Sequence, residues 1–153
     1  MADYNFSGFA CIKNVLDTIE NDIQNPSKFK RMVYNKPKRY QVLKRKDTKV
    51  LEPSSNNIYF IFDNLGRCQY IGKKENKKGI NTRIKSHIVQ NTQAKTKSCI
   101  KKIYDYIMTL PIPSRFVYYK SFLIEPHWMA PAVESYFITL FKKKGEAKWV
   151  KRK

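Results

Sequence analysis

Residues 58–72 read IYFIFDNLGRCQYIG, and this stretch decides the fold expected for the chain. Two runs rich in β-branched and aromatic side chains flank the turn-forming sequence DNLG, residues 63–66. The pattern therefore predicts a β-hairpin. A turn centred in the middle of DNLG would place Tyr59 directly opposite Tyr70, with both phenols on one face of the sheet.

The two tyrosines allow two interpretations. An aromatic cross-strand pair that only stabilises the sheet is the simpler one. The other is a patch in which two hydroxyls act together on a ligand. A register slip of one residue would remove the pairing altogether, because successive side chains of a strand point to opposite faces.

Further elements follow on both sides of the hairpin. Apolar residues spaced three or four apart predict helices over residues 9–24, 80–90, 97–109 and 131–143. A third strand is predicted over residues 115–124, and RYQVLK, residues 39–44, is a candidate short strand. This order predicts an α+β domain with a small three-stranded, mainly antiparallel sheet flanked by helices, after an N-terminal helix and a basic arm.

The charge balance is the unusual feature of the composition. The 153 residues include 31 Lys and Arg against 12 Asp and Glu, a formal net charge of +19. Such an excess disfavours the compact state by self-repulsion, so a polyanionic partner is expected, and nucleic acid fits best. A solubility or localisation device is the alternative. Residues 28–49 concentrate ten of the basic side chains against one Asp.

Other classes of protein are disfavoured. Cys11, Cys68 and Cys99 are widely spaced and form no C-x-x-C pair, which argues against a disulfide framework and a zinc site. The sequence has neither a signal peptide nor an apolar run of spanning length, and no basic amphipathic helix stands out. A cytoplasmic protein without a membrane partner is expected.

The predicted helix over residues 80–90 carries Arg83 and His87 four residues apart, one turn from each other on neighbouring surface. An Arg at the edge of a core next to a His can form a fixed array of donors for phosphate oxygens. A solvated Arg and a partly buried structural His are the simpler interpretation.

The last predicted helix places a carboxylate among apolar side chains. Glu134 falls inside the broad arc formed by Val133, Phe137, Ile138, Leu140 and Phe141. A buried carboxylate requires a partner, which predicts either a salt bridge or a bound Mg²⁺ or Mn²⁺ ion, since hard cations take oxygen ligands.

Together these features resemble the GIY-YIG nuclease superfamily over roughly residues 56–147. The two motifs of the family correspond to residues 57–59, NIY, and 70–72, YIG. The Arg and His of the family's helix match Arg83 and His87, and its metal-binding Glu matches Glu134. Two positions depart from the pattern: Asn57 replaces the first glycine, and Glu146 stands about where many members carry an Asn.

The resemblance implies a role for each site residue. Tyr59 would deprotonate or orient the attacking water, and Tyr70 would orient the phosphate or the water network. Arg83 would neutralise charge in the transition state, and His87 would assist proton transfer or hold the attacking tyrosine. Glu134 would hold a single Mg²⁺ or Mn²⁺ ion.

The resulting prediction is a metal-dependent endonuclease of restriction or phage type that acts on double-stranded DNA. Residues 1–54 would be a helix and a DNA-contacting arm, residues 55–147 the catalytic domain and residues 148–153 a basic tail. Expected DNA contacts are Lys73, Lys74, Lys77 and Lys78 after the hairpin, and Lys36, Lys38, Arg39, Lys44 and Arg45 in the arm.

Three points stay open. A nucleic-acid-binding protein that keeps the fold but has lost turnover is the main alternative, and the departure at Glu146 favours it. A basic ribosome-associated protein is a more remote one. A homodimer is an option, because cleavage of both strands by one small active site usually calls for two copies.

Overall fold

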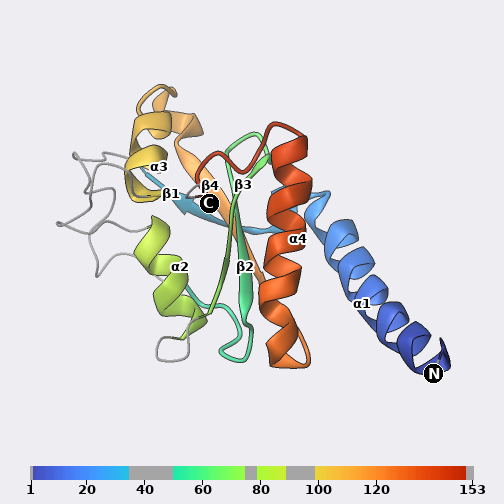
Figure 1. Ribbon diagram of the computed structural model, residues 1–153. Helices are drawn as coiled ribbons and strands as arrows, with labels where there is room; N and C mark the ends of the chain where they lie inside the picture. Colours follow the sequence, from blue (N-terminus) through green and yellow to red (C-terminus); the bar gives the residue numbers. More distant parts are fainter. Residues whose placement is uncertain (1, 35–49, 75–78, 89–98, 151–153) are drawn as a thin grey trace.

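The structure is a computed structural model that describes residues 2–34, 50–74, 79–88 and 99–150 (Figure 1). Its centre is a four-stranded antiparallel sheet in the order β1-β4-β2-β3. The strands are β1 (Lys30–Val33), β2 (Ile58–Phe62), β3 (Cys68–Lys73) and β4 (Phe116–Phe122). The α+β class is therefore confirmed, but the expected number of three strands is wrong.

The additional strand is β1, which lies inside the predicted basic arm and pairs with β4 at one edge of the sheet. Only Met32 of its four residues is buried, whereas Lys30 and Arg31 are exposed. A short edge strand with charged side chains lacks the alternation that marks a strand in sequence. The candidate strand at residues 39–44 lies outside the described residues.

The described residues form four α-helices: α1 (Ala2–Ile23), α2 (Ile80–Ile88), α3 (Cys99–Ile107) and α4 (Ala130–Lys143). All four lie where apolar periodicity predicts helices, and Pro131 occupies the first turn of α4, where its missing N–H costs no hydrogen bond. Short 3-10 turns precede β1, β4 and α4: η1 (Pro26–Lys28), η3 (Ile112–Ser114) and η4 (His127–Met129).

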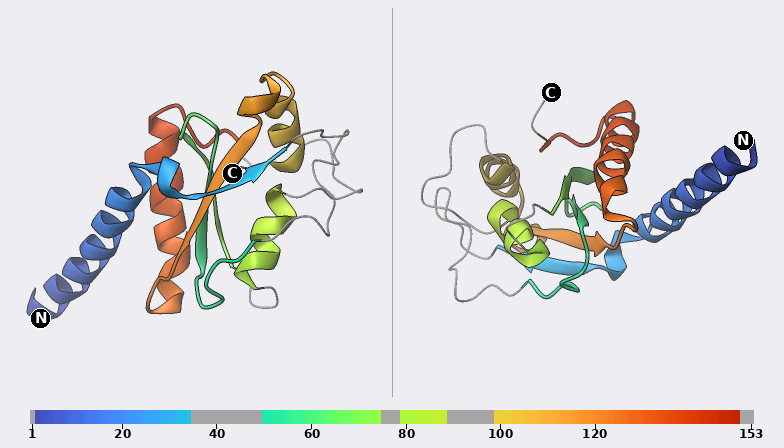
Figure 2. Two further views of the ribbon diagram at one scale, coloured as in Figure 1. Left: turned by 180° about the vertical axis from the view of Figure 1, so that it is seen from behind. Right: turned by 60° about the horizontal axis from the view of Figure 1, so that its bottom comes forward.

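The helices bury the two faces of the sheet in separate cores (Figure 2). Helices α2 and α3 cover one face, where Tyr59 and Ile61 of β2 pack. Helix α4 and the end of α1 that lies near the sheet cover the other face, against Phe60 and Phe62. Every residue of β2 is buried as a result, as expected for a central strand covered on both sides.

The β2–β3 hairpin has a different register from the predicted one. Tyr59 lies opposite Gly72, and Tyr70 lies opposite Ile61. The loop is closed by a hydrogen bond from the Asp63 N–H to the Arg67 carbonyl, and Gly66 has a φ of 83°. A left-handed glycine in a short hairpin loop, with the register shift just after Ile61, moves the pairing by two residues.

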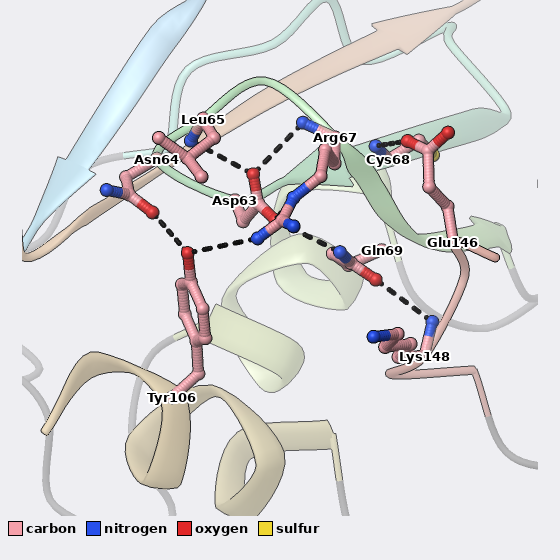
Figure 3. A network of polar contacts seen from close by, with 9 residues as sticks. All are labelled: Asp63, Asn64, Leu65, Arg67, Cys68, Gln69, Tyr106, Glu146 and Lys148. Atoms are coloured by element: carbon pink, nitrogen blue, oxygen red, sulfur yellow. Dashed lines mark hydrogen bonds and ion pairs between the residues drawn. The ribbon is translucent and has the colours of Figure 1, made fainter. Parts of the chain in front are cut away.

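The loop itself is held by the buried carboxylate of Asp63 (Figure 3). Its Oδ1 accepts hydrogen bonds from the backbone N–H groups of Leu65 and Arg67, both at 3.0 Å. Its Oδ2 accepts from Arg67 Nε at 2.7 Å and from Gln69 Nε2 at 3.0 Å. Four donors compensate for removing this charge from water.

The chain after α4 returns to the start of β3. The Ala147 N–H donates to the Cys68 carbonyl, and the Trp149 N–H donates to the Gln69 carbonyl, both at 2.9 Å. The Trp149 ring is 6% exposed and belongs to the same core as Tyr59. The first half of the β3 edge is therefore covered, whereas the second half lines a cleft among the described residues.

Candidate functional site

Three aromatic side chains meet on the face of the sheet that α2 covers. Tyr59 comes from β2, Tyr70 from β3 and His87 from α2. The centroid of the Tyr59 ring lies 5.9 Å from the centroid of the Tyr70 ring and 5.9 Å from that of the His87 ring. The centroids of the Tyr70 and His87 rings are 4.5 Å apart. Tyr70 Oη and His87 Nε2 are at hydrogen-bond distance, 3.2 Å. The predicted common face of the two tyrosines is thus confirmed, although they lie diagonally across the strands rather than directly opposite.

The absence of a side chain at Gly72 makes room for the Tyr59 ring of this cluster. A Cβ atom at this position would lie 2.4 Å from Tyr59 Oη and 2.5 Å from Tyr59 Cζ, so the phenol occupies the space that any other side chain would need. The Tyr59 side chain is 0% exposed as a consequence. Tyr70, two residues before Gly72, is half-buried and remains accessible.

A cleft of about 520 Å³ lies along the second half of β3. It collects Tyr70 and Lys73 from β3, Arg83 from α2, and Glu134 and Lys142 from α4. Helices α2 and α4 cover opposite faces of the sheet, and β3 is its edge strand. Residues from both faces therefore reach one cleft only because it follows this edge.

The electrostatics of the cleft favour an anion. Among the described lining residues, three cationic side chains, Arg83, Lys73 and Lys142, outnumber a single carboxylate, Glu134. Burial, and secondarily the nearby Arg83 guanidinium, lower the pKa of His87 to about 4. His87 is therefore neutral at neutral pH and can either accept a hydrogen bond from Tyr70 or donate one, depending on its tautomer.

Glu134 is half-buried, whereas the helical arc predicted a buried carboxylate. Val133 and Phe137 take the inward positions of α4, so Glu134 lies at the edge of the apolar stripe and faces the cleft. Within the described residues no group of three or more His, Cys, Asp or Glu is placed to hold a metal ion. The Glu134 carboxylate in this cleft still fits Mg²⁺, which commonly takes one protein carboxylate together with waters and substrate phosphate.

The predicted site residues are largely brought together. Tyr70, Arg83 and Glu134 line the cleft, His87 adjoins it through Tyr70, and Tyr59 lies behind Gly72. Lys73 lines the same cleft, and Lys74 lines a neighbouring one. The remaining expected DNA contacts lie outside the described residues: Lys36, Lys38, Arg39, Lys44, Arg45, Lys77 and Lys78.

Glu146 has a structural contact. Its Oε1 accepts a hydrogen bond from the Cys68 N–H at 2.8 Å, at the covered end of β3 (Figure 3). Lys142, in contrast, lines the cleft and was not singled out from the sequence. The sequence feature that could have indicated Lys142 is its spacing from Glu134: it lies eight residues later, about two helical turns along the same side of α4.

The other expectations concern cysteines and membranes. Cys68 is a free, buried thiol, and burial raises its pKa well above the ordinary value, with Glu146 adding to the effect. Such a thiol is unreactive. In the part of the chain that the structure describes, none of the helices combines the length and the apolar character needed to cross a membrane.

Comparison with models of known protein families gives no match, and comparison with curated proteins gives none either.

Proposed function

We propose that this protein is an endonuclease that hydrolyses phosphodiester bonds of DNA with the help of Mg²⁺ or Mn²⁺, as in the GIY-YIG superfamily that its motifs resemble. The observation that carries the proposal is the cleft on the β3 edge, where Tyr70, Arg83 and Glu134 meet. A phenol, a guanidinium and a carboxylate around one anion-favouring cleft are the groups that phosphodiester hydrolysis needs.

The residues of the site have distinct roles in the proposed hydrolysis. A metal ion bound through Glu134 would stabilise charge on the phosphate and on the leaving oxygen. Arg83 binds a non-bridging oxygen and stabilises the charge that develops there. Water attacks phosphorus while its proton passes to the Tyr70–His87 pair, and the bond from phosphorus to the leaving oxygen breaks. Tyr59 has a supporting role in this scheme, because its hydroxyl is enclosed behind Gly72 while Tyr70 lines the cleft.

Plasmid cleavage in Mg²⁺, with DNA affinity measured in parallel under chelator, tests the metal role. Glu134→Gln is expected to lower the cleavage rate by about 10²-fold or more while leaving affinity nearly unchanged, because it removes a ligand but keeps the shape. Glu125→Gln removes an exposed carboxylate outside the cleft and is the matched control. Substantial Mg²⁺-dependent cleavage by Glu134→Gln would contradict the proposal.

The same assay separates the two tyrosines. Tyr70→Phe is expected to lower the rate by roughly 10²-fold, a typical contribution of acid–base help, and Tyr59→Phe by less. This reverses the order that the family resemblance implies.

A nucleic-acid-binding protein without turnover is the second candidate. It is favoured by the enclosed hydroxyl of Tyr59 and by the structural use of Glu146. Wild-type protein that binds DNA yet leaves plasmid intact in both Mg²⁺ and Mn²⁺ would establish this alternative.

Double-stranded DNA as partner and a homodimer as the active form belong to the same proposal. The net charge of +19 supports the first. The homodimer is proposed because cleavage of both strands of a duplex by one small active site usually calls for two copies. Sedimentation of the protein with and without duplex DNA tests it.

A further inference from the structure

A second cleft of about 690 Å³ lies next to the first, and the two share Lys73. Its lining combines Lys73 and Lys74 from the end of β3 with His127 and Trp128 from η4. Asn57 and the first residues of α4 complete it. None of its described lining residues is acidic. The cleft therefore offers positive charge and one large aromatic surface side by side.

Trp128 is the unusual element of this lining. Its side chain is 77% exposed, more than any other large apolar side chain described, whereas Trp149 is 6% exposed. Large aromatic rings normally contribute stability by burial, and an exposed one in a concave basic site is typical of a binding surface. An indole offers a flat face on which a nucleobase can stack, and this stacking tolerates any base.

Asn57 holds both walls of the cleft in place. Its side-chain Oδ1 accepts from the Ile124 N–H at 2.8 Å, and its Nδ2 donates to the Ile124 carbonyl at 2.8 Å and reaches His127 Nδ1 at 3.0 Å. Its carbonyl accepts from the Lys74 N–H at 2.8 Å. The backbone carbonyl of Asn57 thus holds the β3 end that carries the lysines, and its side-chain amide holds the turn that carries Trp128. Asn57 is also the residue that departs from the glycine of the first motif, and a glycine would make none of the side-chain contacts.

We infer that this second cleft binds an unpaired nucleotide, with its base stacked on Trp128 and the adjoining phosphates contacted by Lys73 and Lys74. The inference rests on the proposed function, since it gives the nucleic acid a second subsite next to the first. Charge complementarity favours this occupant over an apolar partner, because two lysines flank the ring and the described lining residues include no carboxylate. Lys73 lies in both clefts, so the bound nucleotide adjoins the phosphate held by Arg83.

The experiment measures binding of a short oligothymidylate under chelator, so that cleavage does not contribute. The chain has two tryptophans, and only Trp128 is exposed. Stacking is expected to quench the intrinsic fluorescence of the wild type and of Trp149→Phe, but not that of Trp128→Phe. Trp128→Ala is expected to weaken binding about 10-fold, a typical loss for one base–aromatic stack. Because the ring is exposed, this variant keeps the core intact.

Two controls match these changes. Leu65→Ala shortens another exposed apolar side chain, in the hairpin loop, and is expected to leave affinity unchanged. Lys73→Ala and Lys74→Ala are each expected to lower the slope of log affinity against log salt by about 0.7, the single-strand value per phosphate contact. Lys143→Ala, an exposed lysine that lines neither cleft, is expected to leave the slope unchanged.

Unchanged affinity in Trp128→Ala, or quenching that persists in Trp128→Phe, would overturn the inference. So would a shift from dimer to monomer in Trp128→Ala with normal oligothymidylate binding, because the ring would then be a self-association contact. Failure of this inference can be distinguished from failure of the proposed nuclease function. Quenching at Trp128 without any plasmid cleavage refutes the nuclease and keeps the nucleotide site. Plasmid cleavage by the wild type, together with normal oligothymidylate binding by Trp128→Ala, keeps the nuclease and refutes the nucleotide site.

Discussion

The hydroxyl of Tyr59 lies where a side chain at residue 72 would begin, and this single contact arranges the candidate site. It buries one tyrosine of the pair and leaves Tyr70 on the cleft wall. The glycine of YIG is therefore required by close approach of a ring, not by a turn. Two tyrosines that look equivalent in the sequence have different access to a substrate.

His87 is the residue for which pH dependence is expected. Its pKa is about 4 in the folded protein, below the ordinary 6.5, because burial and Arg83 disfavour the charged form. Between pH 6.5 and 4 the unfolded chain therefore binds more protons, and stability falls as pH is lowered through this window. The loss attributable to His87 is roughly 2 kcal/mol after allowing for partial exposure.

Urea denaturation at several pH values between 7 and 4 measures this effect. His87→Gln removes the titration, so its free energy of unfolding is expected to fall less steeply with acid than that of the wild type. His127→Gln replaces the other histidine of the chain, which is exposed, and serves as the control. Equal slopes for the wild type and His87→Gln would show that the imidazole is not held neutral by folding.

Among the structural elements, the β2–β3 hairpin depends on its loop. Asp63 has no exposed surface and accepts four hydrogen bonds from the loop and from the start of β3. Gln69, one of these donors, also accepts from the Lys148 N–H at 3.0 Å through its side-chain oxygen. The loop that sets the register is thereby linked to the segment that closes the chain.

Asp63→Ala is expected to lower the free energy of unfolding by roughly 3 kcal/mol, because buried donors lose their acceptor. Asp105→Ala removes an exposed carboxylate paired with Lys101 one turn away on α3, and a cost below about 0.5 kcal/mol is expected. Chemical denaturation of the two variants gives the comparison. Similar losses for both would mean that the Asp63 network does not hold the loop.

For the whole molecule, the net charge of +19 is the dominant property, and much of it lies in residues 28–49. Strand β1 and Tyr34 connect the start of this segment to the fold: the Tyr34 hydroxyl donates to the Ile88 carbonyl at 2.8 Å, and the ring is fully buried. Deleting the N-terminal region would therefore remove a strand and a core residue. Neutralising charges is the appropriate test of DNA contacts in the arm.

Lys36→Gln combined with Lys38→Gln is expected to lower the slope of log affinity against log salt on duplex DNA by about 1.8, at about 0.9 per phosphate contact. Lys13→Gln combined with Lys143→Gln removes the same charge from exposed positions on two helices and is expected to change the slope little. Equal changes in both double variants would indicate that net charge, rather than contact by the arm, determines the salt dependence.

Local patterns in the sequence predicted the four helices, the hairpin and the strand at Phe116–Phe122, because each depends on neighbours in the chain. The same patterns placed Arg83 beside His87 on one helix and the two tyrosines on one face of the sheet. They did not predict β1, whose charged residues conceal an edge strand, nor the register, which depends on a left-handed glycine and a shift in pairing.

The sequence alone thus determined the helices, the hairpin and β4, together with the chemical groups that they carry, since periodicity and turn chemistry are local properties. Only the tertiary structure decided which of these groups share a cleft. Tyr70, Arg83 and Glu134 come from a strand and from helices on opposite faces of the sheet, and they meet because β3 is an edge strand whose second half lines the cleft. Tertiary contacts also decided that Tyr59 is enclosed, that Glu146 holds the backbone of Cys68, and that Trp128 stays exposed. Such outcomes depend on contacts between residues far apart in the chain, which no local pattern encodes.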